Sequence, residues 1–158
     1  MNFTDTERVI LANQYEILAK LDNEQAYLDL AENLRDGHEW IYDQKISISP
    51  IFNKEQSDFV VSILELYEVI QSSFDALSDK GSLTEDRVKF PGFDGNNEGD
   101  YKRFFSALVK NQQFAHVNAN TNSHMQKIST YKHMLGKWES LGKGYELSLD
   151  DIEAIFDR

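Results

Sequence analysis

The stretch NKEQSDFVVSILELYEVIQSSFDAL, residues 53–77, decides the fold. Its apolar side chains recur every three or four residues, which is the period of one helix face. Asn53 is followed three residues later by Gln56. This pattern is typical of a capping box, in which two side chains accept hydrogen bonds from backbone amides at a helix start. The stretch therefore predicts a long amphipathic helix that opens at Asn53 and is ended by Gly81.

The apolar face of this helix contains two adjacent stripes. The first consists of Phe59, Ile63, Leu66, Ile70, Phe74 and Leu77, and the second of Val60, Leu64 and Tyr67. A helix packed on one side needs a narrower apolar arc, and the near-heptad spacing of the first stripe suits packing against a similar helix. We therefore predict a homodimer or higher homo-oligomer, with the first stripe, Phe59 to Phe74, as the candidate interface. The alternative buries both stripes inside one chain, as the central helix of a bundle.

Shorter helices are predicted on both sides of the long one. Upstream, residues 5–21 follow a T-x-x-E capping box and carry the stripe Leu11, Tyr15, Leu18 and Leu21; a second helix ends at Gly37. Residues 38–52 alternate weakly and predict a short strand or irregular packing. Downstream, a Gly- and Asn-rich connection over residues 83–99 precedes helices near residues 101–109, 128–138 and 149–156. The fold class is therefore all-α: one domain over residues 1–158, a compact bundle of about five to seven helices with a long aromatic and Gly-rich loop, and at most a minor short strand.

Composition excludes several classes of function. The 158 residues include no cysteine, which excludes disulfides, thiolate nucleophiles and cysteine-ligated metals. The formal net charge of −11 disfavours binding to nucleic acid and to anionic membranes. The apolar runs are only a few residues long, and the first residues, MNFTDTERVI, lack a secretory signal pattern. We therefore expect a cytoplasmic protein with no membrane attachment.

Three stretches together resemble the YfbU family of bacterial proteins. They are ERVILANQYEILAKLD at residues 7–22, RVKFPGFDGNNEGDYKRF at residues 87–104, and YKHMLGKWESLGKGYELSLDDIEAIF at residues 131–156. The likeness spans nearly the whole chain and is weakest over residues 36–53 and 118–126. The resemblance implies a compact helical protein of the bacterial cytoplasm, and it supplies no mechanism.

The loop at residues 90–100 is the strongest candidate for a binding loop, because it combines aromatic residues, acids and glycines beside a helix start. Its candidate residues, taken with one distant histidine, are Phe90, Gly92, Phe93, Asp94, Glu98, Asp100 and His116. Starting from Asp94, oxygen-bearing side chains alternate as in a calcium loop, but Phe105 occupies the twelfth position, where a bidentate carboxylate is needed. The alternative interpretation is a turn-rich loop whose acids favour the positive end of the following helix.

The four histidines do not have metal-site spacing, because no two of them lie three or four residues apart on a predicted helix. Folding can still bring His116 and His124 near Asp94 or Glu98. No phosphate-binding loop, dinucleotide turn or nucleophile elbow occurs. We therefore predict no metal and no cofactor.

Two hypotheses for function follow, and the sequence leaves open whether the protein is an enzyme. The leading one is a non-enzymatic regulatory protein that binds its own copies or an unidentified protein partner. The alternative is a small-molecule or metal-dependent enzyme with its site near residues 90–100 and His116.

Overall fold

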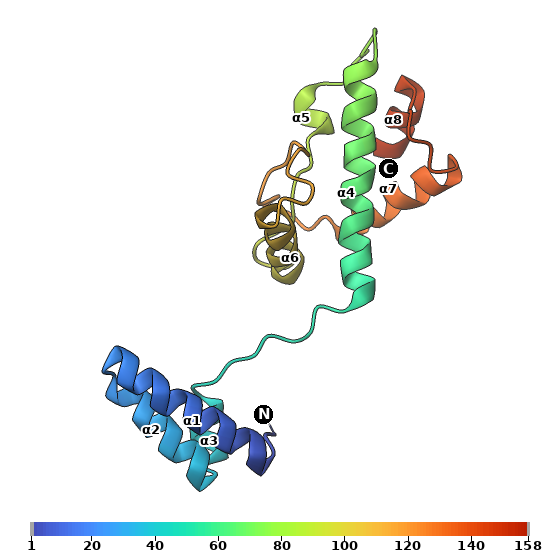
Figure 1. The fold of residues 1–158 in the computed structure, drawn as a ribbon. Helices are drawn as coiled ribbons and strands as arrows, with labels where there is room; N and C mark the ends of the chain where they lie inside the picture. The colour runs from blue at the N-terminus through green and yellow to red at the C-terminus, as the bar shows by residue number, and fades with distance from the viewer. Residues whose placement is uncertain (1, 158) are drawn as a thin grey trace. The chain divides into compact units, whose positions relative to one another are not determined.

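The computed structural model describes residues 2–157, which form eight α-helices and two isolated β-bridges (Figure 1). The helices are α1 (Asp5–Asp22), α2 (Gln25–Asp36), α3 (Glu39–Asp43), α4 (Lys54–Ala76), α5 (Glu85–Val88), α6 (Gly99–Lys110), α7 (Ile128–Ser140) and α8 (Leu149–Phe156). The predicted all-α class is confirmed. Within the described residues, no helix is both long and apolar enough to cross a membrane.

Contacts divide the chain into two compact units, residues 1–51 and residues 52–158. We call them the N-terminal unit and the C-terminal unit. Each has its own buried cluster of apolar side chains. The prediction of one domain over the whole chain stays a prediction.

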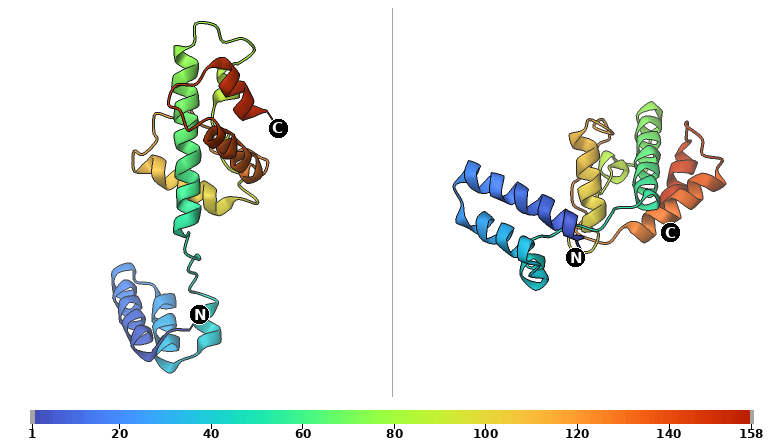
Figure 2. Two further views of the ribbon diagram at one scale, coloured as in Figure 1. Left: turned by 90° about the vertical axis from the view of Figure 1, so that its right-hand side faces the viewer. Right: turned by 60° about the horizontal axis from the view of Figure 1, so that its bottom comes forward.

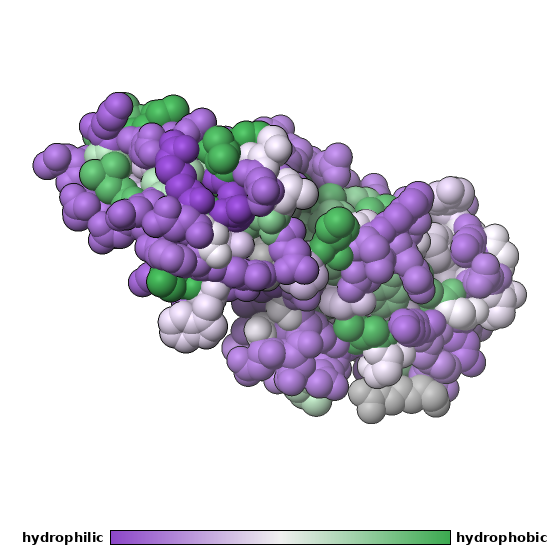
Figure 3. Space-filling view, turned by 90° about the horizontal axis from the view of Figure 1, so that it is seen from below, coloured by the Kyte–Doolittle hydropathy of each residue, from purple (hydrophilic) through white to green (hydrophobic). Residues whose placement is uncertain are grey.

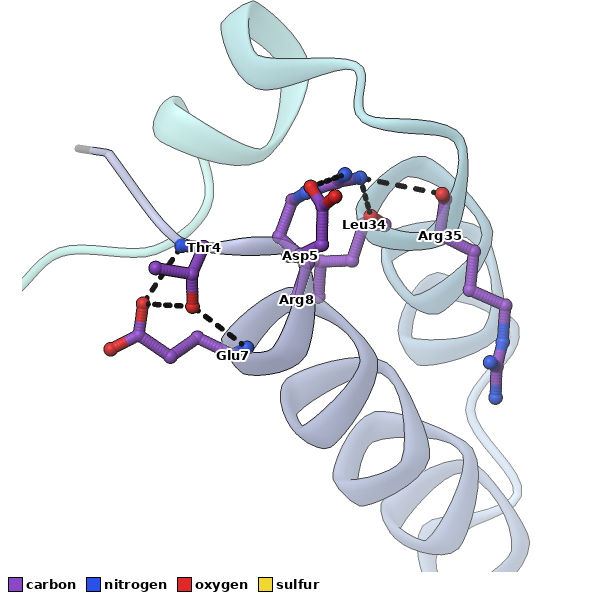
Figure 4. A network of polar contacts seen from close by, with 6 residues as sticks. All are labelled: Thr4, Asp5, Glu7, Arg8, Leu34 and Arg35. Atoms are coloured by element: carbon purple, nitrogen blue, oxygen red, sulfur yellow. Dashed lines mark hydrogen bonds and ion pairs between the residues drawn. The ribbon is translucent and has the colours of Figure 1, made fainter.

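The N-terminal unit is a hairpin of α1 and α2 completed by the short α3. Among the described residues of this unit, the buried cluster consists of Ala12, Leu30, Ala31, Leu34 and Tyr42. Figure 4 shows how polar contacts join α1 to the end of α2: Nη1 of Arg8 donates to the carbonyl oxygens of Leu34, at 2.8 Å, and Arg35, at 3.3 Å. These carbonyls lie in the last turn of α2, where a cation is favourable.

The predicted capping boxes of α1 and α4 are both present. Thr4 and Glu7 exchange side-chain and backbone hydrogen bonds at the start of α1, and Asn53 and Gln56 do so at the start of α4. Helix α4 ends at Ala76, five residues before Gly81.

The weakly alternating segment contains a short helix rather than a strand. Tyr42, in α3, is the buried residue of this segment, and Trp40 beside it is exposed. A single strand needs a partner to satisfy its backbone groups, whereas a helical turn satisfies them locally. The backbone amides of Ile41 and Tyr42 both donate to the carbonyl of His38, which explains why the alternation did not produce a strand.

Helix α4 is the central helix of the C-terminal unit, which is the alternative arrangement considered above. Helices α5 and α6 lie on one side of it, and α7 and α8 on the other (Figures 1 and 2). Of the candidate interface residues, Ile63, Leu66 and Ile70 are completely buried by the chain itself, Phe74 is 3% exposed, and Phe59 packs against the same core. These residues therefore form an internal core and not an exposed stripe, which corrects the predicted interface. The predicted homo-oligomer stays a prediction.

Candidate functional site

The aromatic residues of the 90–100 loop are part of the core of the C-terminal unit. Phe90 and Phe93 are completely buried, and Phe90 contacts the rings of Tyr67 and Phe105. The loop backbone pairs with a distant segment: the amide of Phe90 donates to the carbonyl of Asn118 at 2.9 Å. Two isolated parallel bridges, at Phe90 and at Phe93, result from this pairing.

Gly92 allows the loop to approach that distant segment closely. Its φ is +82°, a value that favours glycine, and a Cβ at this position would lie 2.5 Å from the carbonyl oxygen of Asn120. The hydroxyl of Tyr131 on α7 donates to the carbonyl of Gly92 at 2.6 Å. Gly92 therefore has a structural role at the meeting point of the loop, residues 118–122 and α7.

The buried carboxylate of Asp94 accepts hydrogen bonds within its own loop. Its oxygens accept from the side-chain amide of Asn97, at 2.5 Å, and from the backbone amide of Asn96, at 3.2 Å. These hydrogen bonds, first the one from the Asn97 side chain, hold the pKa of Asp94 below its ordinary value, and His124 lowers the pKa further by its charge. The charged form is therefore favoured in the folded loop.

Glu98 is buried and connects the loop to α7. One carboxylate oxygen, Oε1, accepts hydrogen bonds from the backbone amides of Lys127 and Ile128 at 2.7 and 2.9 Å, and the other, Oε2, accepts from the amide of Asp94 at 3.0 Å. The first two donors lie at the N-terminus of α7, where amides have no partner within the helix. Glu98 therefore acts as a helix cap supplied from another part of the chain.

The two remaining candidates, Asp100 and His116, lie outside this buried cluster. Asp100 is exposed and forms an ion pair with Arg103 on the same helix. Nε2 of His116 lies 2.9 Å from Oε1 of Glu68 on α4, and both side chains are about half exposed. They line a cavity of about 450 Å³ together with Gln71, Asp75 and Glu85.

The structure thus places the candidate residues predicted from the sequence in separate parts of the C-terminal unit. It brings Phe90, Gly92, Phe93, Asp94 and Glu98 together as a buried structural cluster, and it places His116 with Glu68 instead. His124, not His116, is the histidine that influences Asp94. Across residues 2–157, no group of three or more His, Asp or Glu side chains is arranged to hold a metal ion.

A second candidate site, missed by the sequence analysis, is the apolar surface of the N-terminal unit. Of the fourteen large hydrophobic residues exposed within the described chain, ten belong to this unit, among them Leu21 at 74% and Trp40 at 77%. The full set is Val9, Ile10, Ile17, Leu18, Leu21, Leu28, Trp40, Ile41, Ile48 and Ile51. Figure 3 shows apolar residues exposed between hydrophilic ones on the face that it draws. Concentrated apolar exposure of this kind is typical of interaction surfaces.

Helix α1 carries much of this surface because only one of its faces packs against α2. Ala12 and Ala19 are buried, whereas Ile10 and Ile17 are each more than half exposed. The predicted stripe of Leu11, Tyr15, Leu18 and Leu21 assumed one apolar face. The adjacent pairs Ile10–Leu11 and Ile17–Leu18 were the signal for a second face, because neighbouring residues on a helix point about 100° apart.

The fold and these two sites define a mainly helical protein with a buried loop cluster and an exposed apolar helix hairpin. The YfbU domain matches residues 1–158, and the chain belongs to the YfbU family. A UPF0304 protein of Methanocaldococcus jannaschii (strain ATCC 43067 / DSM 2661 / JAL-1 / JCM 10045 / NBRC 100440) is 32% identical, with 96% of each chain covered. UPF0304 proteins of Actinobacillus succinogenes (strain ATCC 55618 / DSM 22257 / CCUG 43843 / 130Z) and Pasteurella multocida (strain Pm70) are each 31% identical, with 99% of each chain covered. The family resemblance stated from the sequence is confirmed.

Proposed function

We propose that this protein is a non-enzymatic regulatory protein of the cytoplasm that binds its own copies or a protein partner through the apolar surface of its N-terminal unit. The observation that carries the proposal is the concentration of exposed apolar side chains in residues 9–51. Monomeric soluble proteins rarely expose large contiguous apolar patches, and such patches mark binding surfaces.

The small core of the N-terminal unit supports the same proposal. A unit of about fifty residues buries a smaller fraction of its surface than a larger domain and is marginally stable by itself. Within residues 2–51, five hydrophobic side chains make up the buried cluster, and two of them are alanines. Covering Ile10 or Ile17 with another protein surface removes more apolar area from water, and each Å² removed contributes about 25 cal/mol of favourable free energy. Association therefore stabilises the unit that carries the surface.

The rival function, an enzyme with its site at residues 90–100 and His116, has weaker support. Acid–base or metal chemistry needs side chains that face a substrate. The Glu98 carboxylate instead accepts three backbone hydrogen bonds, and Asp94 is held by Asn96 and Asn97. His116 lies with Glu68, on another part of the unit. The net charge of −11 also argues against nucleic acid as the partner.

Hydrogen exchange of the full chain at submicromolar and at tens of micromolar concentration tests the proposal. We expect amides of residues 5–43 to exchange more slowly at the higher concentration, because association covers the N-terminal unit, while protection of α4 stays the same. Slower exchange confined to the C-terminal unit would contradict the proposed surface. Exchange that is independent of concentration, together with a monomeric mass by light scattering, would end the self-association part of the proposal.

A further inference from the structure

We infer that α1 carries a self-complementary seam that pairs antiparallel with α1 of a second copy of this chain. The seam consists of Ile10, Gln14, Ile17 and Leu21, all exposed. This inference rests on the proposed function and names both the partner and the contact.

The seam has the spacing of a coiled coil. Its residues lie four, three and four positions apart, which is the alternation of a and d positions in a heptad. Ile10, Ile17 and Leu21 are 51%, 57% and 74% exposed. With Gln14 at an a position, Ile10 and Ile17 take d positions and Leu21 the next a position. Three of the four seam residues are therefore large and aliphatic, as a helix pair requires.

The opposite face of α1 is already occupied. Ala12 and Ala19 lie seven residues apart at the f positions of the same heptad, directly opposite the seam. They are 0% and 7% exposed because α2 covers them. Contact with α2 therefore buries one face of α1 and leaves the seam exposed to a second helix.

Two properties of the seam favour a second copy over a different partner. A coiled coil needs matched heptads in both helices, and a second copy supplies the same seam in a two-fold contact. The seam residues are also uncharged, although the chain carries a net charge of −11. Pairing two copies along these four residues therefore brings no like charges together. Repulsion between like charges would oppose association of a strongly acidic chain at a charged surface.

The position of Glu7 favours the antiparallel orientation. Glu7 is the a position one heptad before Gln14, so a parallel pair places two Glu7 carboxylates in one layer. An antiparallel pair instead places Ile10 against Leu21 of the second copy and Gln14 against its Ile17. It also places the positive N-terminal end of each helix beside the negative C-terminal end of the other, which is electrostatically favourable.

The absence of cysteine from the chain makes the contact directly testable. We would prepare full-length Gln14→Cys and Ile17→Cys, mix them under mild oxidation, and identify the disulfide-linked species by mass. Each variant has one thiol, so every disulfide joins two copies and cannot report a contact with the same chain's C-terminal unit. Leu28→Cys mixed with Ile48→Cys is the control, because both residues are exposed in the same unit but lie outside the seam.

We expect the Gln14→Cys/Ile17→Cys heterodimer to form several-fold faster than the control pair and than either seam homodimer. Homodimers of Gln14→Cys in excess would overturn the antiparallel arrangement. Crosslinking no faster than in the control would overturn the seam. If hydrogen exchange still showed concentration-dependent protection of the N-terminal unit, the proposed function would survive that failure; otherwise both would fail. Far-ultraviolet circular dichroism checks that each variant keeps the helix content of the wild type.

Discussion

Glu98 caps α7: its Oε1 lies 2.9 Å from the backbone nitrogen of Ile128, thirty residues further along the chain. The same oxygen accepts a hydrogen bond from the amide of Lys127. A carboxylate near the N-terminus of a helix also interacts favourably with the helix dipole. An acidic side chain that looked like a ligand in the sequence thus connects the 90–100 loop to α7.

We expect Glu98→Ala to lower the free energy of unfolding by about 1–3 kcal/mol, because buried backbone amides lose their acceptor. Urea denaturation followed by the fluorescence of the buried Trp138 measures the change. Glu65→Ala is the matched control, since Glu65 lies on the exposed side of α4. Equal midpoints for the two variants would show that the cap contributes nothing to stability.

Alanine substitutions at three glycines distinguish the cost of a steric clash from the cost of a left-handed backbone conformation. Gly92 and Gly142 both have positive φ, but a Cβ would clash only at Gly92, and Gly136 lies in the middle of α7 with open space around its Cβ position. We expect Gly136→Ala to stabilise by about 0.5–1 kcal/mol through helix propensity. Gly142→Ala should destabilise by about 1–2 kcal/mol through its left-handed backbone, and Gly92→Ala should destabilise most. Thermal unfolding gives the order, and Gly92→Ala no worse than Gly142→Ala would contradict the close approach to Asn120.

The sequence predicted the helices well because their signals are local. The capping boxes at Thr4 and Asn53 depend on residues three positions apart, so they are visible without the fold. The role of Glu98 was not predictable, because its partners lie about thirty residues away and a carboxylate can equally bind a cation. The burial of Leu66 was ambiguous for a similar reason: an apolar stripe has the same pattern whether its cover comes from α6 and α7 or from another chain.

Acid should weaken the folded state through Asp94. Hydrogen bonds from Asn97 and Asn96 hold its pKa below the ordinary value of 3.8. Because the folded pKa is the lower one, the stabilisation is fully present above pH 3.8 and is lost as the pH falls through the folded value. We expect Asp94→Asn to be less stable than the wild type at neutral pH and to lose less stability on acidification. Parallel stability curves for the two proteins between neutral pH and pH 3 would contradict this assignment.

Substitutions in α4 and in α1 should differ strongly in their effect on the stability of the monomer. Leu66 is completely buried, so Leu66→Ala should cost about 2–5 kcal/mol of stability through a cavity and lost burial. Ile17 is 57% exposed, and Ile17→Ala should change the stability of the monomer by less than about 0.5 kcal/mol. Chemical denaturation at submicromolar concentration, where association is minimal, measures both. A folded, fully stable Leu66→Ala protein would contradict the central position of α4.

Light scattering of the full chain at tens of micromolar is the most direct test of the claim that the N-terminal unit mediates association. The wild type should have a mass above that of the monomer that falls on dilution. Ile17→Glu should be folded and monomeric, because it places a charge in the apolar seam. Tyr145→Glu, an equally drastic change at an exposed residue of the C-terminal unit, should associate like the wild type. A strictly monomeric wild type, or an Ile17→Glu variant that associates as strongly as the wild type, would contradict the account.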